Sequence, residues 1–371
     1  MRYREIPHGK EKVGVIGLGT VYYHHSDLTE VERTVRTALS HGVNYFDMIV
    51  EREEAFLSYA KAWEGVPRSA YAIQMHFGAV YENGPYGWTR DLDRIKGAIQ
   101  KQMQMLKIEY ADMGYVHCID EEEDFRHVMR HGLWDYMKGM KADGKIRHLG
   151  CSTHNPDILR RFLDTGLIDM AMFSVNMAYD YASDGPYAIG NRENRYRLYQ
   201  ECESAGVGLS VMKPFGGRRL LDERISPFHC AFTTNQCIQY ALDRPAVLTV
   251  LPGVPNAEYL KRALAFLEAS EEERDYAKLA DVTPEKIEGT CVYCNHCLPC
   301  PKGLNIGLIN KYYDLARVGD ALAAQHYQNL EGKANACVAC KHCEKRCPFH
   351  VKQEARMKEI SQYFKEEPVQ R

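Results

Sequence analysis

Two runs of closely spaced cysteines near the C-terminal end constrain the fold of this chain more than any other feature of the sequence. Two- or three-residue gaps separate the members of each run, and a proline follows each last cysteine. The runs are Cys291, Cys294, Cys297 and Cys300, then Cys337, Cys340, Cys343 and Cys347. Thiolates at this spacing can converge on one centre, so the pattern predicts metal ligation rather than disulfide bonds.

The second run has the C-x2-C-x2-C-x3-C-P spacing of bacterial ferredoxins, and the first has one residue fewer before its last cysteine. In that pattern the distal cysteine binds the other cluster. We therefore expect two [4Fe–4S] clusters with crossed ligands, one held by the first three cysteines and Cys347, the other by the last run's first three and Cys300. Zinc is the alternative, but it favours two separated pairs of ligands over four consecutive cysteines. The remaining five cysteines are scattered along the chain and are predicted to be small buried side chains.

The chain before the cysteines repeats a short apolar strand, a polar loop and an amphipathic helix, from about Val13 to Glu268. Eight strands are expected, beginning at Val13, Val43, Tyr71, Asp112, Arg147, Asp169, Gly208 and Val247. Helices are expected over Glu30–Leu39, Leu92–Leu106, Phe125–Met140, Pro156–Leu163, Glu193–Ser204 and Asn256–Leu267. This is the size of a (β/α)8 TIM barrel. The alternative, a doubly wound open sheet, lacks its G-x-G-x-x-G turn here.

The expected domains are a barrel over residues 1–270, a charged connector over 271–289 and a small α-helical, ferredoxin-like domain over 290–371. The segment between the cysteine runs has a helical apolar period. The N-terminus lacks an apolar signal segment, no apolar run could span a bilayer, and the net charge of -3 gives no basic excess. We expect a cytoplasmic protein that binds neither membranes nor nucleic acids.

Six segments of the barrel region resemble the aldo-keto reductase family, in particular its bacterial branch with a C-terminal ferredoxin-type tail. They are VNYFD from Val43, DMGYVH from Asp112, GKIRHLGCSTH from Gly144, FSVN from Phe173, MKPFGG from Met212 and LPGVPN from Leu251. The resemblance implies reduction of carbonyl compounds with a nicotinamide cofactor, by an Asp, Tyr, Lys and His tetrad at the C-terminal ends of the strands.

Only half of that tetrad matches. Asp47 and His117 stand at the family's Asp and His positions, whereas Arg52 and His76 stand where Tyr and Lys belong. Because histidine titrates near neutrality, we predict a catalytic Asp47, His76 and His117 arrangement in which an imidazole delivers the proton. Tyr22, Tyr23 and Tyr81, on nearby loops, are weaker candidates for a phenolic donor.

The resemblance also implies cofactor-binding residues. Ser152, Asn155 and Asn176 stand where the family holds the nicotinamide. The loop Lys213, Pro214, Phe215, Gly216, Gly217 and Arg218 resembles the one that receives the pyrophosphate, because its glycines permit close backbone approach. The residues after the eighth strand do not distinguish NAD from NADP.

Together these features predict an iron–sulfur oxidoreductase acting on a small carbonyl, hydroxyl or unsaturated substrate. The candidate cofactor is NAD(P)H, and an external electron-transfer partner is a candidate acceptor or donor for the clusters. The altered tetrad keeps a second class open, a non-redox lyase or isomerase that uses the same histidines and has structural clusters. A third is an electron-transfer module whose barrel only docks a partner.

Overall fold

The computed structural model describes residues 1–19, 27–82, 86–183, 187–282, 289, 291–317 and 321–366. Seven parallel strands form one sheet, each paired with the next. In order they are β3 (Tyr45–Asp47), β4 (Ala72–Phe77), β7 (Ala111–Val116), β8 (Ile146–Thr153), β9 (Met170–Ser174), β10 (Gly208–Met212) and β11 (Val247–Val250). An eighth segment closes the sheet, because Ile16 bridges Val250 of β11 and Leu18 bridges Phe46 of β3. The expected closed barrel is confirmed.

Two short antiparallel hairpins decorate the barrel. The first pairs β1 (Tyr3–Glu5) with β2 (Lys12–Gly14) ahead of the closing segment. The second pairs β5 (Ala79–Val80) with β6 (Gly87–Trp88) directly after β4. The sequence analysis did not anticipate either hairpin, and the second one carries a tyrosine to the mouth of the barrel.

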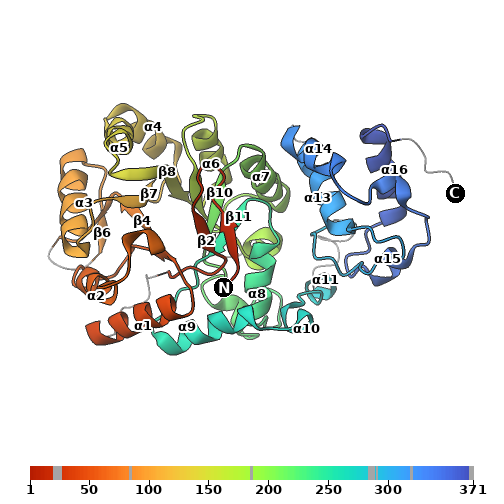
Figure 1. The fold of residues 1–371 in the computed structure, drawn as a ribbon, viewed down its shortest axis with the longest axis horizontal. Helices are drawn as coiled ribbons and strands as arrows, with labels where there is room; N and C mark the ends of the chain where they lie inside the picture. Colours follow the sequence, from red (N-terminus) through yellow and green to blue (C-terminus); the bar gives the residue numbers. More distant parts are fainter. Residues whose placement is uncertain are drawn as a thin grey trace.

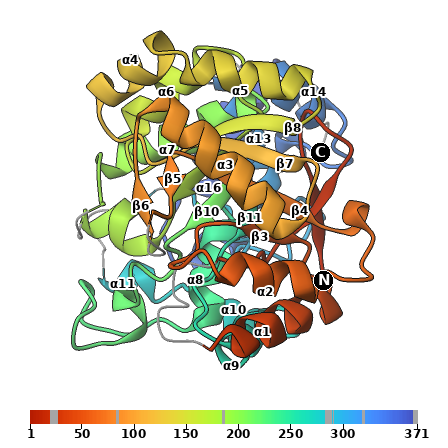
Figure 2. The ribbon, with the colours of Figure 1, turned by 90° about the vertical axis from the view of Figure 1, so that its left-hand side faces the viewer.

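Helices surround the strands (Figure 2). They are α1 (Leu28–Ser40), α2 (Ala55–Ala62), α3 (Leu92–Leu106), α4 (Glu122–Arg130), α5 (Leu133–Ala142), α6 (Pro156–Leu163), α7 (Arg192–Ser204), α8 (Thr234–Leu242) and α9 (Ala257–Leu264). Their starts follow local chemistry: Asp91 caps α3, and Asn155 caps α6 with a proline in its first turn. Those two helices have the predicted bounds.

One helix prediction was wrong. Phe125–Met140 was expected to be continuous, but it is divided into the end of α4 and most of α5. Gly132 lies at the break with φ +85°, a left-handed conformation that no α-helix interior contains. The expected helix Asn256–Leu267 is also divided: α9 ends at Leu264, and the 3-10 turn η4 (Ala265–Leu267) follows it.

Two buried layers hold the barrel together. Between the strands and the helices lies a large apolar core that includes Val35, Phe56 and Ile99. A separate cluster inside the barrel joins facing strands and includes Tyr45, Met113, Tyr115, Met170 and Leu248. Because this interior is filled with side chains, only the ends of the barrel are free to form a site.

The C-terminal part forms a second lobe beside the barrel (Figure 1). Its helices are α13 (Ile306–Arg317), α14 (Ala321–Gln328), α15 (His342–Arg346) and α16 (Gln353–Tyr363). The preceding α10 (Glu271–Arg274) packs against α8 of the barrel, and α11 (Leu279–Val282) places Leu279 in the barrel's apolar core. The second lobe has an apolar core of its own, with Leu304, Ile309, Tyr327 and Met357. The expected helical character of this domain is confirmed.

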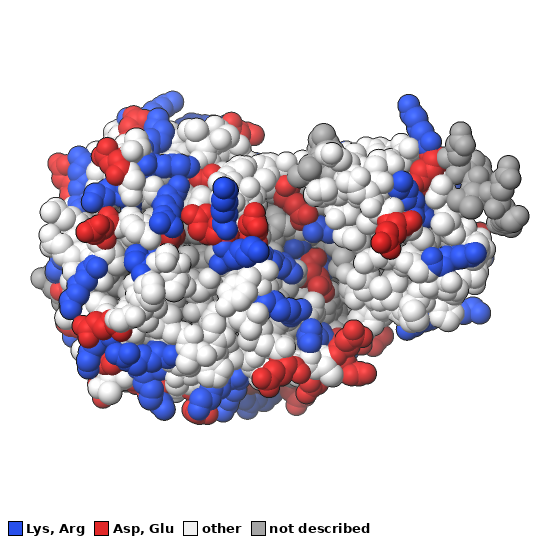
Figure 3. Space-filling model, viewed as in Figure 1, with Lys and Arg blue, Asp and Glu red and all other residues white. Residues whose placement is uncertain are grey.

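The two lobes meet where α13 and α14 pack against α7. Lys311 of α13 forms an ion pair with Glu203 of α7 at 2.8 Å. The buried guanidinium of Arg244 donates to the carbonyl oxygen of Val292 at 2.7 Å, between two of the cysteines. On the face shown in Figure 3, positive and negative side chains are interspersed over both lobes. Among the described residues, no helix is both long and apolar enough to cross a membrane.

Candidate functional site

The C-terminal ends of β3, β4 and β7 bring Asp47, His76 and His117 together. His76 Nε2 lies 2.8 Å from Asp47 Oδ1, and the two side chains are each 1% exposed. His76 Nδ1 lies 3.2 Å from Nδ1 of His117. The predicted Asp–His–His arrangement is therefore one continuous chain of contacts, at the end where barrel enzymes hold their catalytic groups.

The Asp47 carboxylate, oriented by Gln74, favours one arrangement of protons along the two histidines. Oε1 of Gln74 accepts hydrogen bonds from the hydroxyls of Tyr45 (2.6 Å) and Ser210 (3.0 Å), so its Nε2 donates to Asp47 at 3.0 Å. The carboxylate can only accept, so it takes the N–H of His76 Nε2. Gln74 Nε2 also lies 2.9 Å from this nitrogen, and its second hydrogen then faces Met172 Sδ at 3.3 Å. A neutral His76 must consequently accept at Nδ1, which makes Nδ1 of His117 the donor and leaves its Nε2 as an acceptor.

The group that meets this acceptor is Tyr86, whose hydroxyl oxygen lies 2.6 Å from His117 Nε2. Tyr86 is 39% exposed and directly precedes β6, and its backbone N–H donates to the Glu51 carbonyl at 2.7 Å. Burial raises the pKa of Tyr86 to about 12, and burial also lowers the pKa of His117, assisted by the neighbouring His76. No sequence pattern predicts a role for this phenol, because no spacing rule links residue 86 to the strand ends that carry Asp47 and the histidines.

The other residues considered as donors are placed differently. Tyr81 is buried, and its hydroxyl oxygen accepts a hydrogen bond from the N–H of Val50. This bond holds the loop after β3. The side chain of Arg52 is 67% exposed and lies 3.6 Å from Glu54. Tyr22 and Tyr23 lie outside the described residues. Between Tyr81 and Tyr86, it is Tyr86 that continues the histidine chain.

A second polar chain lies at the ends of β8 and β10. His154 Nδ1 donates to Asp120 at 2.9 Å, and Nζ of Lys213 lies 2.9 Å from His154 Nε2. The ring of Tyr187 stacks on His154 with 4.4 Å between centroids, and Lys213 Nζ lies 4.2 Å from the same ring. Burial lowers the pKa of Lys213.

Cys118, Asp120 and His154 offer ligand atoms within 4.8 Å of one another, which is compatible in distance with a metal ion. Both ring nitrogens of His154 are already in hydrogen bonds, however, and Asp120 also accepts from the His154 backbone N–H and from Thr153. An amine beside the group would also compete with a cation. We therefore assign these residues to a hydrogen-bonded group.

The side chains predicted to hold the nicotinamide form hydrogen bonds within the protein. Asn176 is fully buried, donates to the Lys213 carbonyl at 2.9 Å and accepts from the N–H of Tyr179. The side chain of Asn155 caps α6 and donates to the Asp120 carbonyl. Ser152 Oγ accepts the N–H of Cys118 at 2.7 Å. All three surround the barrel mouth, where they orient its loops.

The predicted pyrophosphate loop is open. Gly216 and Gly217 have φ values of +57° and +66°, and nothing lies within 4 Å of where a Cβ of Gly217 would stand. Pro214 and Phe215 pack below the loop, and the exposed Arg218 donates to the Tyr259 hydroxyl at 3.2 Å. The N–H of Gly216 donates to the Lys213 carbonyl at 3.0 Å, so the exposed backbone at Gly217 is the part of the loop that a phosphate group could approach closely.

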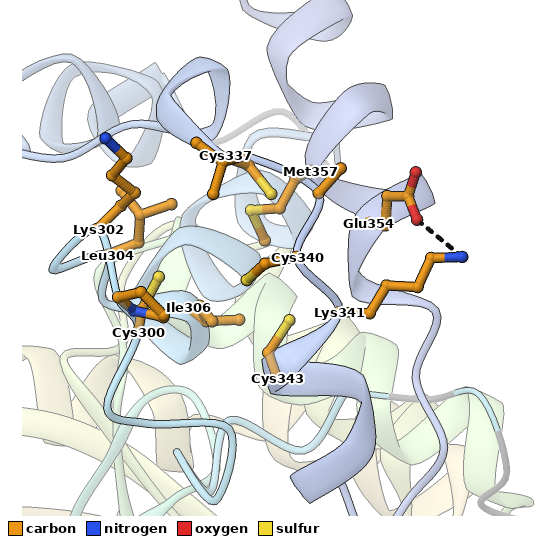
Figure 4. Close-up of a pocket in the computed structure, with 13 residues that line it drawn as sticks. Cys300, Lys302, Leu304, Ile306, Cys337, Cys340, Lys341, Cys343, Glu354 and Met357 are labelled. Carbon is orange, nitrogen blue, oxygen red and sulfur yellow. Dashed lines mark ion pairs between the residues drawn. The ribbon is translucent and has the colours of Figure 1, made fainter. Parts of the chain in front are cut away.

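The second lobe gathers the cysteines in two groups. Cys300, Cys337, Cys340 and Cys343 line one hollow, with their side chains around it (Figure 4). Leu304, Ile306 and Met357 supply apolar walls, and the Lys341–Glu354 ion pair of 3.2 Å lies at its rim. A soft-ligand pocket with apolar walls fits an iron–sulfur cubane.

Cys291, Cys294, Cys297 and Cys347 form the other group, and Cys347 acts electrostatically on the pKa of each of the other three. In both runs, every two-residue gap before the third cysteine contains a residue with left-handed backbone. These are Tyr293, Asn295, Ala339 and Lys341, with φ of 61°, 62°, 55° and 59°. Each such residue turns the chain back, so that successive sulfurs face one centre.

Comparison with known proteins agrees with these observations. The model of the aldo/keto reductase family matches residues 14–236, and a 4Fe-4S dicluster domain matches residues 290–352. This chain belongs to the aldo/keto reductase family and carries a C-terminal 4Fe–4S domain. The expected oxidoreductase class is thus supported, as is the expected iron–sulfur domain.

The relatives found are distant. Aldo-keto reductase AKR11C1 from Bacillus halodurans, in its holo form, is 21% identical, covers 76% of this chain and 96% of its own, and has a TM-score of 0.61. An aldo/keto reductase from Klebsiella pneumoniae, solved with NADP and acetate, is 20% identical, covers 74% and 93%, and has a TM-score of 0.52. The oxidoreductase YqkF of Bacillus subtilis, described as uncharacterized, is 22% identical over 284 residues, covering 70% of this chain and 89% of the relative. The two solved structures share the barrel fold with this chain, and at identities of 21% and 20% the similarity shows the fold alone.

Proposed function

We propose that this protein is an iron–sulfur oxidoreductase that reduces or oxidises a small carbonyl, hydroxyl or unsaturated compound at the barrel mouth, with Tyr86 as its proton donor. In this proposal residues 1–270 form the barrel with the catalytic pocket, residues 271–289 connect the two domains, and residues 290–371 carry the clusters. The observation that supports this proposal is the contact of 2.6 Å between the Tyr86 hydroxyl and His117 Nε2. It provides a phenol in a barrel that lacks one at the family's position.

Proton transfer follows from the hydrogen-bond directions. With neutral histidines, Tyr86 donates to His117, His117 to His76, and His76 to Asp47. One additional proton on the histidine pair reverses the outermost bond, because a protonated His117 donates from Nε2 to the phenol oxygen. The Tyr86 O–H is then free to donate to a substrate oxygen. Asp47 stabilises the additional positive charge from the buried end of the chain.

A nicotinamide cofactor, when bound, supplies the hydride for such a reaction. The loop backbone of Lys213, Pro214, Phe215, Gly216, Gly217 and Arg218 would receive its pyrophosphate, with the Lys213 side chain directed to His154 instead, and Ser152, Asn155 and Asn176 would shape the edge of the nicotinamide pocket. The open backbone at Gly217 supports the first assignment. The NADP complex of the Klebsiella pneumoniae relative supports the use of a nicotinamide.

We assign one [4Fe–4S] cluster to Cys291, Cys294, Cys297 and Cys347, and a second to Cys337, Cys340, Cys343 and Cys300. The grouping of thiols around two centres and the left-handed residues in the gaps support this crossed pairing. Burial raises the pKa of Cys291 and of Cys343 to about 11, so iron must displace the protons when it binds. Each cluster takes one electron, which would allow exchange with an external electron-transfer partner.

Anaerobic titration of the purified holoprotein with NADPH and with NADH tests this function. We expect saturable nucleotide binding, two clusters' worth of iron and inorganic sulfide per chain, and turnover of a small aldehyde such as 4-nitrobenzaldehyde. Bleaching of the cluster absorbance by the nucleotide would show that electrons pass between the two domains. Nucleotide binding without bleaching would indicate that the clusters are structural. Failure to bind either nucleotide would overturn the proposal in favour of a non-redox lyase or isomerase.

A further inference from the structure

The chain of Lys213, His154 and Asp120 lies beside the proposed proton path but plays no part in it. The Asp120 carboxylate is saturated: Oδ1 accepts from the His154 backbone N–H (2.6 Å) and the Thr153 hydroxyl (3.0 Å), while Oδ2 accepts from His154 Nδ1 (2.9 Å). These bonds fix the imidazole with its proton on Nδ1. The lone pair of His154 Nε2 therefore points at Nζ of Lys213, 2.9 Å away.

This environment differs from that of two other partly buried lysines, Lys141 and Lys311. Lys141 and Lys311 form ion pairs with carboxylates, Asp169 at 2.7 Å and Glu203 at 2.8 Å. Lys213 meets an imidazole and an aromatic ring instead. The desolvation that lowers its pKa thus acts on an amine whose immediate acceptor can also take its proton.

Both polar chains face the same space. His117 directly follows β7 and His154 directly follows β8, the strand paired with β7, while Asp120 lies three residues after His117, so the second chain lies beside the first. Lys213 itself is half-buried and has a left-handed backbone, with φ +55°. A reactive amine and a proton donor consequently border one opening at the C-terminal ends of the strands.

We propose that Lys213, with His154 as its base and Asp120 as the group that orients the base, forms an imine with an aldehyde or ketone that enters the barrel mouth. A nucleophile, a base in hydrogen-bond contact and a third group that orients the base are the general arrangement of an activated nucleophile. Lys213 and His154 are the reacting pair, and Asp120 is a positioning residue.

The chemistry is balanced without an oxidant or a further reactant. His154 Nε2 takes a proton from the Lys213 ammonium, and the free Nζ attacks the carbonyl carbon, so that a C–N bond forms as the C=O π bond breaks. Proton transfer to the oxygen and loss of the second amine hydrogen release water and leave a C=N bond. Water reverses the step. A protonated imine attracts electrons more strongly than the parent carbonyl, which favours chemistry at the neighbouring carbon.

Reductive trapping of the intact holoprotein tests this assignment. The protein is treated anaerobically with limiting glycolaldehyde and sodium cyanoborohydride, and the hydroxyethyl groups fixed on each lysine are followed in time by peptide mass spectrometry. Lys311, whose side chain is 27% exposed, is the internal control because it is also partly buried but paired with a carboxylate. We expect Lys213 to be modified about tenfold or more faster than Lys311.

His154→Gln retains an acceptor but not a base, so it should slow modification of Lys213 and leave that of Lys311 unchanged. Lys213→Arg should abolish the labelled peptide and verify its assignment. Equal rates at Lys213 and Lys311 would overturn the proposal, and so would an unchanged Lys213 rate in a folded His154→Gln protein that keeps its cluster absorbance. The readout does not use nucleotide or turnover, so failure of the redox proposal leaves it interpretable.

Discussion

Two hydroxyl groups, those of Tyr45 and Ser210, determine the direction of the proton path at the barrel mouth. Both donate to Oε1 of Gln74, which turns the amide N–H towards Asp47, and the Asp47 carboxylate in turn favours a proton on His76 Nε2. A buried network of this kind is specific because each member has a single donor or acceptor left to use. The reactive end, Tyr86, therefore depends on residues deep in the barrel.

Replacing Tyr86 by Phe removes the proposed donor and keeps the ring that packs near His117. We expect turnover to fall by about 10² to 10⁴-fold, the usual contribution of general acid catalysis, with nucleotide affinity unchanged. Steady-state kinetics and an equilibrium nucleotide titration measure the two quantities. Tyr81→Phe serves as the matched control, because that hydroxyl holds the Val50 N–H and not a histidine. Similar turnover in Tyr86→Phe and wild type would exclude the role of Tyr86.

The pH dependence should reveal the buried histidine pair. Because burial lowers the pKa of His117, its charged form appears only below the ordinary value of about 6.5. The rate of carbonyl reduction should rise as the pH falls, with a half-maximal pH below that value. In Asp47→Asn the half-maximal pH should move lower still, since the carboxylate that stabilises the additional proton is gone. A profile unaffected by this substitution would separate Asp47 from the proton path.

At the scale of single elements, the break between α4 and α5 shows how one backbone angle overrides an apolar pattern. The helical period runs from Phe125 to Met140, yet Gly132 has φ +85°, which ends the helical backbone between α4 and α5. A Cβ at residue 132 would lie 3.2 Å from Leu92 Cδ2. Both the conformation and the contact therefore favour glycine.

Gly132→Ala and Gly139→Ala should have opposite effects. The first should lower the free energy of unfolding by about 1–2 kcal/mol, the cost of a left-handed non-glycine residue. The second should raise it by about 0.5–1 kcal/mol, because Gly139 lies on the exposed side of α5 and nothing lies within 4 Å of where an alanine methyl group would stand. Thermal unfolding of the two variants would measure the difference. Shifts of the same sign would contradict this account of the break.

At the scale of the whole molecule, one buried arginine joins the two lobes. Arg244, at the end of α8, donates to Val292 between Cys291 and Cys294 and contacts the Tyr276 hydroxyl at 3.3 Å. Tyr276 in turn donates to Asp243 at 2.7 Å. Because the guanidinium is 2% exposed, it depends on the position of the cysteine loop for one of its acceptors.

Removing the iron should consequently destabilise the barrel as well as the cluster domain. Loss of the Val292 acceptor should cost about 1.5–3 kcal/mol, the range for a hydrogen bond to a charged group. Calorimetry of holoprotein and chelator-treated protein would show a lower transition temperature for the barrel. In Arg244→Met the difference in barrel transition temperature between holoprotein and chelator-treated protein should shrink, since methionine makes no hydrogen bond to the Val292 carbonyl. An equal difference in both proteins would show that the lobes are not coupled through Arg244.

Much of this architecture could be predicted from the order of residues, because it depends on local spacing. The strand and helix alternation predicted the closed barrel, the cysteine gaps predicted the iron–sulfur domain, and strand ends predicted that Asp47, His76 and His117 would meet. Each of these inferences uses a period or gap of a few residues, which the chain carries wherever it folds.

Only the tertiary structure could connect Tyr86 to His117 and Lys213 to His154, residues that lie 31 and 59 positions apart. The hairpin between β5 and β6, and the loops after β8 and β10, place these side chains by contacts with distant parts of the chain. The sequence by itself determined which chemical groups the barrel contains. Packing decided which of them touch, because the direction of a loop depends on long-range contacts that no local pattern records.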